Sequence, residues 1–352
     1  MNCKHDVYSN RPIEEEIRSL LEGYSLHTPP NPQSGWDAWR EARQSRVYIN
    51  WFTPITREML SDKGCIEVII VRSSGVDHID LEAADENGVC VSNQPEIITE
   101  AVAEFTIAGI LGVLRRMVSM HQHYPKWSRE GWPQHLAGFL LRGRRVGLLG
   151  AGRIGQSVAL KLYALGAGGL LYYSRTAKPA LDTLGARRVS LVELFEHSDI
   201  LVNSLPLTKH TKHLVTVDLL LKLPRNAVYV NIGRGATETP DAIDTVAEKR
   251  PDLHFILDVH PEEPTRQDHP RMKYTGDPRF LLTPHVAGLT HESRIGSTVL
   301  AVLQARDYFR HNCVWNPVTR NCKQCSWGVT DIDKIIELTR KWAWKKGFSK
   351  QA

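Results

Sequence analysis

The chain has 352 residues, of which 42% are hydrophobic and 24% charged, and its formal net charge is +5 at pH 7. This length suits two domains of ordinary size, with enough apolar residues for a sizeable core. The basic residues are spread out apart from Arg142–Arg145 and the last few residues, which argues against a nucleic-acid-binding protein. The longest apolar stretch, Phe105 to Leu114, is far shorter than the roughly 18 residues of a membrane span.

The N-terminal residues M-N-C-K-H-D show no secretory leader, so we expect a cytoplasmic protein whose six cysteines are reduced thiols. Cys322 and Cys325 form a C-x-x-C pair, with Cys313 and His311 upstream. A zinc site there is the alternative, but the second pair lacks regular spacing, and we favour plain thiols.

Apolar segments and helical patterns alternate through the first hundred residues, which predicts an α/β arrangement. A longer helical pattern follows, and then a loop rich in Trp and Pro. The expected elements are strands at Val47–Ile49 and Ile66–Val71, helices at Ile13–Leu21 and Arg57–Leu60, a long helix from about Thr99 to Met120, and the loop Trp127–Pro133.

The most informative motif is R-V-G-L-L-G-A-G-R-I-G-Q, between Arg145 and Gln156. Here a short apolar strand runs into Gly150, Gly152 and Gly155. In such a turn the first glycine permits the tight bend, the second makes room for a pyrophosphate, and the third allows close helix–strand packing. The N–H groups at the start of the next helix then face the phosphate charge. A helix at Ser157–Leu165 and a strand at Gly166–Tyr173 complete the unit, which predicts dinucleotide binding.

Four more strands are expected after this unit, and polar residues follow each of them. Ligands of open parallel sheets bind beyond the carboxyl ends of the strands, so these loops are the place to look for chemistry. Three loops each offer one competent side chain: Arg234 in V-N-I-G-R-G-A, Glu263 in D-V-H-P-E-E-P and His285 in T-P-H-V-A-G. The strands are expected at Ile200–Leu205, Ala227–Ile232, Phe255–Val259 and Phe280–Thr283.

The order and context of these loops resemble the D-isomer-specific 2-hydroxyacid dehydrogenases. The resemblance extends from about Arg46 to Pro317. The segments that carry it are R-S-S-G-V-D-H-I-D at 72–80, N-Q-P with T-E-A-V-A-E at 93–104, G-A-G-R-I-G, S-D-I-L-V-N-S-L-P-L-T at 198–208, N-I-G-R-G, E-E-P and T-P-H.

The resemblance assigns catalytic roles that the chemistry supports. When hydride reaches the carbonyl carbon of a 2-keto acid, charge develops on the oxygen, and a histidine such as His285 is suited to donate a proton there. A carboxylate beside the imidazole orients it and favours its protonated form, which fits Glu263. Glu263 is preferred to Glu262 because it directly precedes Pro264, as in the family. Arg234 would clamp the substrate in its planar fork. Taken singly, the three residues could instead be a loop arginine, a surface acid and a helix cap.

The resemblance also nominates binding residues. The turn that contains Ser74 and Gly75 would hold the substrate carboxylate with backbone N–H groups, and His78 stands where the family often has Asn. Asp258 would hold the nicotinamide carboxamide, the alternative being a helix N-cap. The remaining cofactor contacts nominated are Thr99, Gly150, Gly152, Arg153, Ile154, Gly155, Pro206 and Gly288.

The end of the second strand bears on the choice of cofactor. A turn that prefers NAD has an acid there to bind the ribose hydroxyls. This chain has Ser174, Arg175 and Thr176, with Lys178 close by, and no acid. Charge-assisted bonds from Arg175 would favour a 2′-phosphate, so we predict a preference for NADP; a solvated loop that accepts either cofactor is the alternative.

The sequence therefore predicts an α/β protein with two Rossmann-like domains, doubly wound parallel sheets and an active-site cleft between them. The substrate domain would comprise residues 1–98 and a return at 289–318, the NAD(P)-binding domain 99–288, and a C-terminal extension 319–352. The expected function is NAD(P)H-dependent reduction of a small 2-keto acid, such as glyoxylate or hydroxypyruvate, to its D-2-hydroxy acid. The long helix and the Trp-rich loop resemble the dimer interface of the family, which predicts a homodimer without nucleic-acid or membrane partners.

Two other functions are compatible with the same residues. One is oxidation of an unusual donor such as phosphite; formate is less suitable, since those relatives pair the histidine with Gln. The other is a dinucleotide-sensing protein like the corepressors that share this fold. The extension bears on the second function, because Ile332–Trp344 has apolar residues at helical spacing. We favour packing of this segment on its own subunit or on a dimer mate over docking of a partner.

Overall fold

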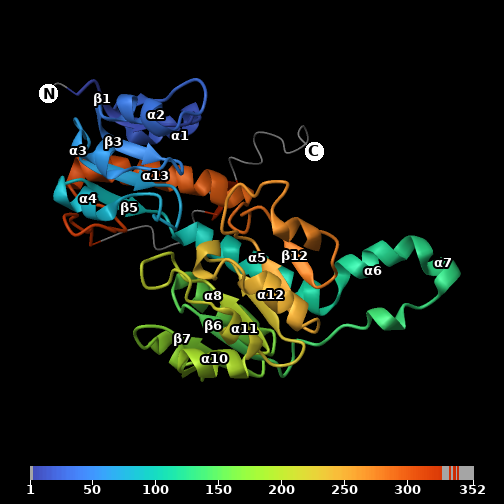
Figure 1. Cartoon of the computed structure of the whole chain (residues 1–352). Coiled ribbons are helices and arrows are strands. Elements are labelled where there is room, and N and C mark those ends of the chain that lie inside the picture. The colour runs from blue at the N-terminus through green and yellow to red at the C-terminus, as the bar shows by residue number, and fades with distance from the viewer. Residues whose placement is uncertain (1–2, 327–332, 334–335, 338, 341–352) are drawn as a thin grey trace. The chain divides into compact units, whose positions relative to one another are not determined.

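A computed structural model describes residues 3–326, 333, 336–337 and 339–340 (Figure 1). The chain divides into two compact units. Unit 1 consists of Met1–Ile98 and Leu289–Ala352, and unit 2 of Thr99–Gly288. Most of the helix expected over Ile332–Trp344 lies outside the described residues.

Unit 1 is built on a five-stranded sheet of order β2-β1-β3-β4-β5, in which every strand pair is parallel. This order places a topological switch point between β1 and β3. The strands are β1 (His5–Ser9), β2 (Leu26–His27), β3 (Ser45–Asn50), β4 (Val68–Val71) and β5 (Cys90–Asn93), and the helices are α1 (Glu15–Arg18), α2 (Gly35–Ala42), α3 (Arg57–Ser61), α4 (Leu81–Glu86) and α13 (His291–His311).

Both faces of this sheet are covered, because successive side chains of a strand point to opposite faces. Val47 and Ile49 of β3 pack in one core with α13 and the segment around α1. Tyr48, between them, packs in the other core with Trp39 of α2 and residues of α3 and α4. The sheet is therefore doubly wound, as the apolar runs in the sequence predict.

After α13 the chain closes the free edge of β5. The backbone N–H of Val318 donates to the Val91 carbonyl (2.8 Å), and the Val91 N–H donates to Thr319 Oγ1 (2.8 Å). Edge strands expose unpaired backbone groups, and this return segment satisfies those of β5. The segment from Pro317 to Thr319 thus lies along β5 at the edge of the unit 1 sheet.

The expectation of reduced thiols is wrong in this structure. All six cysteines pair, as Cys3–Cys65, Cys90–Cys322 and Cys313–Cys325. The two cysteines of the C-x-x-C motif thus have different partners. No group of three or more potential metal ligands occurs among the described residues, so the zinc alternative gains no support. The Cys90–Cys322 pair follows from the return of the chain to β5, which spacing along the sequence does not reveal.

Unit 2 contains a seven-stranded parallel sheet of order β12-β11-β10-β9-β6-β7-β8. In this order the switch point lies between β6 and β9, and the glycine turn follows β6. The strands are β6 (Arg145–Leu149), β7 (Gly169–Tyr173), β8 (Arg187–Arg188), β9 (Ile200–Asn203), β10 (Val228–Asn231), β11 (His254–Leu257) and β12 (Phe280–Leu282), and the helices are α5 (Glu96–Leu114), α6 (Met117–His123), α7 (Trp127–Glu130), α8 (Arg153–Ala164), α9 (Pro179–Asp182), α10 (Leu191–His197), α11 (Val217–Leu221) and α12 (Ala242–Lys249).

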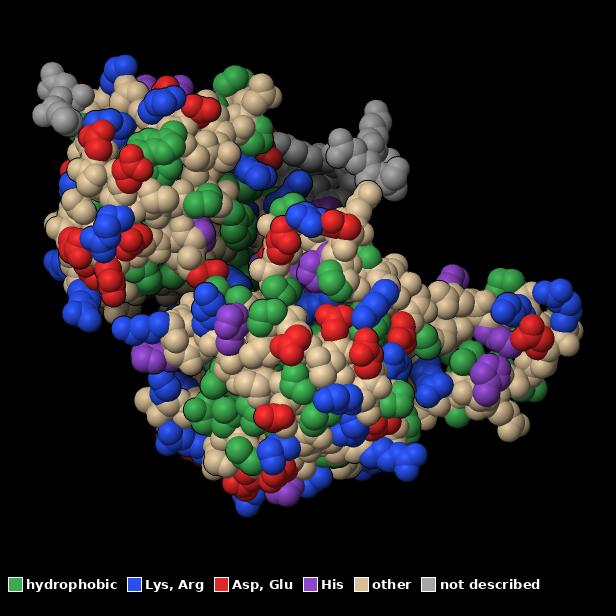
Figure 2. Space-filling model, in the orientation of Figure 1, with side chains coloured by type: hydrophobic (Ala, Val, Ile, Leu, Met, Phe, Trp, Pro, Cys, Tyr) green, Lys and Arg blue, Asp and Glu red, His purple; other side chains and the backbone are tan. Residues whose placement is uncertain are grey.

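The long helix expected from Thr99 to Met120 is in fact two helices. Arg116 adopts a left-handed conformation (φ 50°) between α5 and α6. The segment of α6 and α7 then extends from unit 2 as an arm, residues 117–137, with hydrophobic side chains on its visible surface (Figures 1 and 2). Several of these are well exposed, including Trp132 (80%) and Tyr124 (71%).

Helix α5 bears on the question of a membrane span. In the described part of the chain it is the one helix whose length and composition would suit a span, although the core helix of a soluble protein passes the same test. Gly109 of α5 lies against Ile256 and Leu281 of the sheet of unit 2, so the helix packs on this sheet. The apolar stretch counted in the sequence, Phe105 to Leu114, is shorter than this helix because polar residues are interspersed in its first half.

The predicted fold class is confirmed: the chain is an α/β protein with two parallel sheets covered by helices. The expected cleft between the two domains, and their roles in binding substrate and cofactor, stay predictions.

Candidate functional site

The glycine turn of unit 2 has the geometry that a pyrophosphate needs. Gly150 has φ +93°, which L side chains rarely adopt, and its carbonyl accepts a hydrogen bond from Ser204 Oγ (2.9 Å). A Cβ on Gly155 would lie 2.4 Å from the Gly150 carbonyl oxygen, whereas a Cβ on Gly152 would meet nothing within 4 Å. Tight packing is therefore required at Gly155, and open space remains beside Gly152.

Helix α8 begins directly at this turn. Gly152 is its N-cap and provides no side-chain hydrogen bond to the first N–H groups. Of the residues nominated here, Arg153 is exposed and Ile154 is half-buried. The uncapped start of a helix of three turns favours an anionic group. Pro206 lies in the loop after β9, on the other side of the switch point, and Thr99 is buried early in α5.

The loop after β7 presents basic and hydroxyl groups. Arg188 braces it: Nη2 donates to the Arg175 carbonyl (2.8 Å) and Nε donates to the Ser174 carbonyl (3.1 Å). The Ser174 hydroxyl donates to the Thr176 carbonyl. The side chain of Arg175 is exposed, and Lys178 is half-buried. The loop is thus held by hydrogen bonds from side chains to its backbone carbonyls, and it presents a cationic surface at the end of β7.

Glu263 and His285 are in direct contact. Nδ1 of His285 lies 2.6 Å from Glu263 Oε2, and the other carboxylate oxygen accepts a hydrogen bond from the His260 N–H (2.8 Å). Partial burial raises the pKa of the Glu263 carboxyl, but the hydrogen bonds from His285 and the His260 backbone outweigh it and hold this pKa below its usual value. Glu263 is therefore a carboxylate, and it fixes the imidazole by Nδ1 and leaves Nε2 for other chemistry.

His285 stands on a turn that Asp258 holds in place. The backbone at His285 is left-handed (φ 54°), which is uncommon for a residue other than glycine. Its N–H donates to the Asp258 carbonyl (2.7 Å), and the Asp258 carboxylate accepts hydrogen bonds from the N–H groups of Val286 (2.8 Å) and Ala287 (2.9 Å) and from the Thr283 hydroxyl (2.6 Å). Asp258 is 1% exposed. It holds this loop and caps no helix, and the next helix, α13, begins at His291.

Arg234 lies on the loop after β10, the neighbour of β11 in the sheet. Its Nη1 donates to the Gly233 carbonyl (2.7 Å), and the side chain is half-buried. A Cβ on Gly235 would lie 2.0 Å from the carbonyl carbon of His260, so the Arg234 loop packs tightly on the loop that leads to Glu263. The three candidate side chains therefore follow three adjacent strands, β10, β11 and β12.

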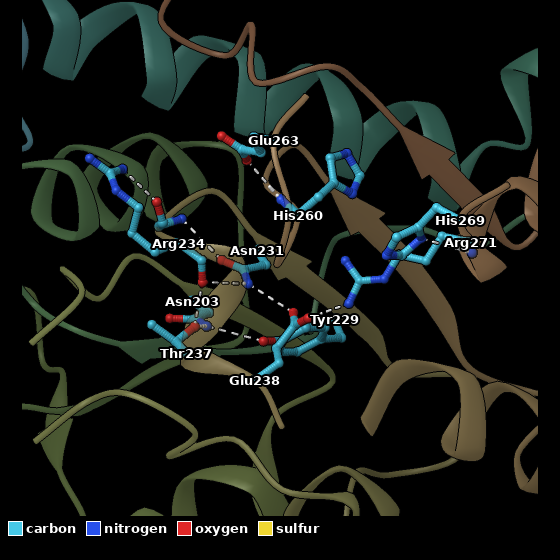
Figure 3. Close-up of polar contacts among 11 residues, drawn as sticks. Asn203, Tyr229, Asn231, Arg234, Thr237, Glu238, His260, Glu263, His269 and Arg271 are labelled. Carbon is cyan, nitrogen blue, oxygen red and sulfur yellow. Dashed lines mark hydrogen bonds and ion pairs between the residues drawn. The ribbon is translucent and has the colours of Figure 1, made fainter. Parts of the chain in front are cut away.

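A buried polar network, which the sequence did not reveal, supports the Arg234 loop (Figure 3). The Arg234 carbonyl accepts hydrogen bonds from Asn231 Nδ2 (3.2 Å) and from the Thr237 hydroxyl (2.7 Å). Asn231 Nδ2 also donates to Glu238 Oε1 (2.8 Å), and Glu238 Oε2 lies 2.6 Å from Arg271 Nη2. The side chains of this ion pair are 0% and 2% exposed.

The network also includes Asn203 of β9, the strand that pairs with β10. Asn203, at the end of β9, donates from Nδ2 to Thr237 Oγ1 (2.9 Å) and to the Tyr229 hydroxyl (3.1 Å). Burial, followed by the charge of Glu238, raises the pKa of Tyr229 well above its ordinary value. Because Tyr229 stays neutral, the charges in this core are those of Glu238 and Arg271.

The substrate loop nominated by the sequence belongs to unit 1. It follows β4, and it is held by its own contacts: the Ser73 hydroxyl donates to the Gly75 carbonyl (2.7 Å), and Asn93 Nδ2 donates to the Ser74 carbonyl (2.7 Å). Ser74 and Gly75 are half-buried. These bonds occupy carbonyl groups of the turn, which is compatible with an anion at its N–H groups.

Comparison with known proteins gives the family context. A family model described as the NAD binding domain of D-isomer specific 2-hydroxyacid dehydrogenases matches residues 107–287. The chain is 34% identical over 308 residues to a glyoxylate reductase of Aeropyrum pernix, which covers 84% of this chain and 90% of that protein. It is 34% identical over 321 residues to a glyoxylate/hydroxypyruvate reductase A of Arabidopsis thaliana, covering 90% and 97%. A crystal structure of a protein from Pyrococcus horikoshii OT3 is similar with a TM-score of 0.78 and 28% identity, covering 96% and 99%.

Proposed function

Because the chain belongs to the D-isomer-specific 2-hydroxyacid dehydrogenase family, and is therefore an NAD(P)-dependent oxidoreductase that reduces 2-keto acids to D-2-hydroxy acids, we propose that His285, Glu263 and Arg234 perform its reaction. The observation that carries this proposal is the 2.6 Å contact between His285 Nδ1 and Glu263. It leaves Nε2 of a fixed imidazole to donate a proton to the substrate oxygen.

Each residue has a separate task. The nicotinamide supplies the hydride when the cofactor is bound. His285 donates a proton as negative charge develops on the carbonyl oxygen of the substrate. The Glu263 carboxylate favours the protonated imidazole that makes this donation and keeps the ring oriented. Arg234 binds the carboxylate and carbonyl oxygens in a planar fork, for which its loop must be rigid. Asp258 acts on the same reaction by holding the His285 turn.

The residues around the glycine turn fit a dinucleotide. Gly150, Gly152 and Gly155, with Arg153 and Ile154 at the start of α8, would hold the pyrophosphate, because a Cβ at Gly152 would occupy space that is open in this structure. Thr99, Pro206 and Gly288 remain proposed contacts of the nicotinamide half. We propose NADP as the preferred cofactor, since Arg175 is exposed at the end of β7 on a loop without an acid.

The proposed substrate is a small 2-keto acid, and glyoxylate and hydroxypyruvate are the first candidates because similar proteins are named for their reduction. The purified protein should oxidise NADPH when one of these acids is present. His285→Ala should abolish turnover and retain cofactor binding, measured by protection of the protein from thermal unfolding. Wild-type rates in this variant would refute the assignment of His285.

The arm formed by α6 and α7 supports a homodimer. Its exposed aromatic residues include Trp132 (80%), Tyr124 (71%) and Trp127 (46%), and monomeric proteins rarely expose such a group of apolar side chains together. Trp132→Arg should therefore shift the sedimentation of the protein from dimer toward monomer. Leu160→Arg, at an exposed leucine of α8, is the matched control (54% exposed). A wild-type protein that sediments as a monomer would refute this assembly.

A further inference from the structure

Unit 1 contains a buried arginine that has no anionic partner among the residues that the structure describes. Arg72 directly follows β4 and is 7% exposed. Its Nε (3.2 Å) and Nη2 (2.9 Å) donate to the hydroxyl of Ser297 on α13. Its Nη1 is buried and has no hydrogen-bond partner among the described residues. A buried charge without a counter-charge is costly, and proteins rarely retain one that serves no purpose.

A second orphan donor lies beside Arg72. The guanidinium carbon of Arg72 is 3.1 Å from the ring centroid of Trp51, at the end of β3. The indole Nε1 of Trp51 is also buried and without a partner in the part of the chain that the structure describes. Arginine and the indole N–H can only donate hydrogen bonds, so the group that satisfies them must be an acceptor.

More positive charge surrounds these donors. Arg11, after β1, lies with its guanidinium carbon 5.4 Å from the same Trp51 ring, and Arg294 lies in the first turn of α13. Burial, followed by the charges of Arg11 and Arg294, lowers the pKa of Arg72 well below its ordinary value, and Glu14 acts weakly in the opposite direction. Arg11 and Arg294 are exposed, whereas Arg72 and the two orphan donors are buried next to them, so the arginines at the surface are the part of the cluster that a solute reaches first.

The position of the cluster connects it with the substrate. Arg11, Trp51 and Arg72 follow β1, β3 and β4, which are adjacent strands of one parallel sheet, so they share its carboxyl edge. The Ser74–Gly75 turn continues directly from Arg72 at that edge. Ligands of such sheets bind at this edge, and here it is also beside the switch point.

We propose that the Arg72 cluster (Arg11, Trp51, Arg72 and Arg294) binds a second acidic group of the substrate, so that among 2-keto acids longer than glyoxylate and hydroxypyruvate those with an additional carboxylate at the far end are preferred. This inference rests on the proposed function, because it concerns the selectivity of the same reaction. Arg72 supplies the buried charge, Trp51 an additional donor, and the two exposed arginines attract the anion.

The kinetic test compares acids of equal length. Wild-type protein is assayed with 2-oxoglutarate and 2-oxopentanoate, and with oxaloacetate and 2-oxobutanoate, so that each pair differs by a terminal carboxylate or methyl group. We expect kcat/KM to be at least about tenfold higher for the diacid of each pair, as one charge-assisted hydrogen bond suffices to produce. Arg72→Met should remove most of this ratio. Arg40→Met is the control, because that arginine is 69% exposed and pairs with Asp37 on α2.

A second measurement needs neither cofactor nor turnover. Malonate at constant ionic strength should raise the melting temperature of the wild-type protein and of Arg40→Met, and should not raise that of Arg72→Met. The same melting curves show whether the Arg72 variant is folded. If the wild type reduces no keto acid yet binds malonate through Arg72, the proposed function fails and the anion site stands.

Three results would overturn the inference. Equal kcat/KM for the members of each pair would show that the enzyme does not recognise a second acidic group of the substrate. Malonate stabilisation that survives in Arg72→Met would show that Arg72 does not bind the anion. Malonate binding without a preference for diacids would show that the cluster binds an anion other than the substrate.

Discussion

The buried ion pair between Arg271 and Glu238 allows a quantitative test. Arg271→Met would leave the Glu238 carboxylate in a site that is 0% exposed, where Asn231 Nδ2 still donates a hydrogen bond to it. Removing one partner of a buried pair costs about 3–5 kcal/mol, because the remaining charge is neither paired nor hydrated. In a domain of this size about 1 kcal/mol lowers the melting temperature by roughly 2–4 °C, so we expect a decrease of about 6–20 °C.

The assay is thermal unfolding of the single and double variants. Arg271→Met combined with Glu238→Gln removes both charges and keeps an acceptor for Asn231, so it should recover most of the stability lost in the single variant. Arg266→Met is the control: its ion pair with Asp268 is 66% and 70% exposed, and its loss should cost less than about 1 kcal/mol. An Arg271→Met protein that melts like the control, or a double variant no more stable than the single one, would refute the reasoning.

The same variants report on catalysis. Asn231 Nδ2 donates hydrogen bonds to both Glu238 and the Arg234 carbonyl. Loss of the ion pair between Arg271 and Glu238 should therefore loosen the Arg234 loop, which is proposed to hold the substrate. Well below the melting temperature, we expect Arg271→Met to raise KM for the keto acid and to leave the affinity for the cofactor nearly unchanged.

Three further predictions follow from the site and the disulfides. Arg175→Ala should reduce the ratio of catalytic efficiencies with NADPH and NADH by about tenfold or more, and an unchanged ratio would leave the cofactor preference without a cause. Because the pKa of Glu263 is lowered from its usual 4.5, the stability it contributes is complete above about pH 4.5 and is lost as the pH falls through the lowered value; acid titration of unfolding should thus be shallower for Glu263→Gln, and identical curves would argue against the contact with His285. Alkylation of the unreduced, denatured protein should label none of the six cysteines, and reduction should cost roughly 2–5 kcal/mol for each disulfide removed.

Local patterns predicted the parts of the site that depend on neighbouring residues. The glycine turn and the loops of Arg234, Glu263 and His285 each occupy a few consecutive positions, and the strands before them are short apolar runs. Strand β5, by contrast, reads C-V-S-N and has no apolar run to reveal it. The break between α5 and α6 falls at Arg116, without the Gly or Pro that usually marks such a turn.

Contacts between distant charged residues were beyond the reach of these patterns. Glu238 and Arg271 are 33 positions apart, and periodicity places charged side chains on the surface by default. The same limit applies to Arg72, which ends an apolar strand and gives no sign of its burial under α13. The Cys90–Cys322 pair was hidden for a related reason, since its two cysteines meet only after the chain has completed unit 2 and returned.

The Cys90–Cys322 bond has a consequence for the chain as a whole. Its two cysteines are 232 positions apart, and the whole of unit 2, Thr99–Gly288, lies between them. The segment that enters unit 2 and the segment that leaves it are therefore joined, and the disulfide closes a covalent ring that contains all of unit 2. A protease that cuts once inside unit 2 would yield a product that keeps its full mass in non-reducing electrophoresis and separates into two fragments only after reduction.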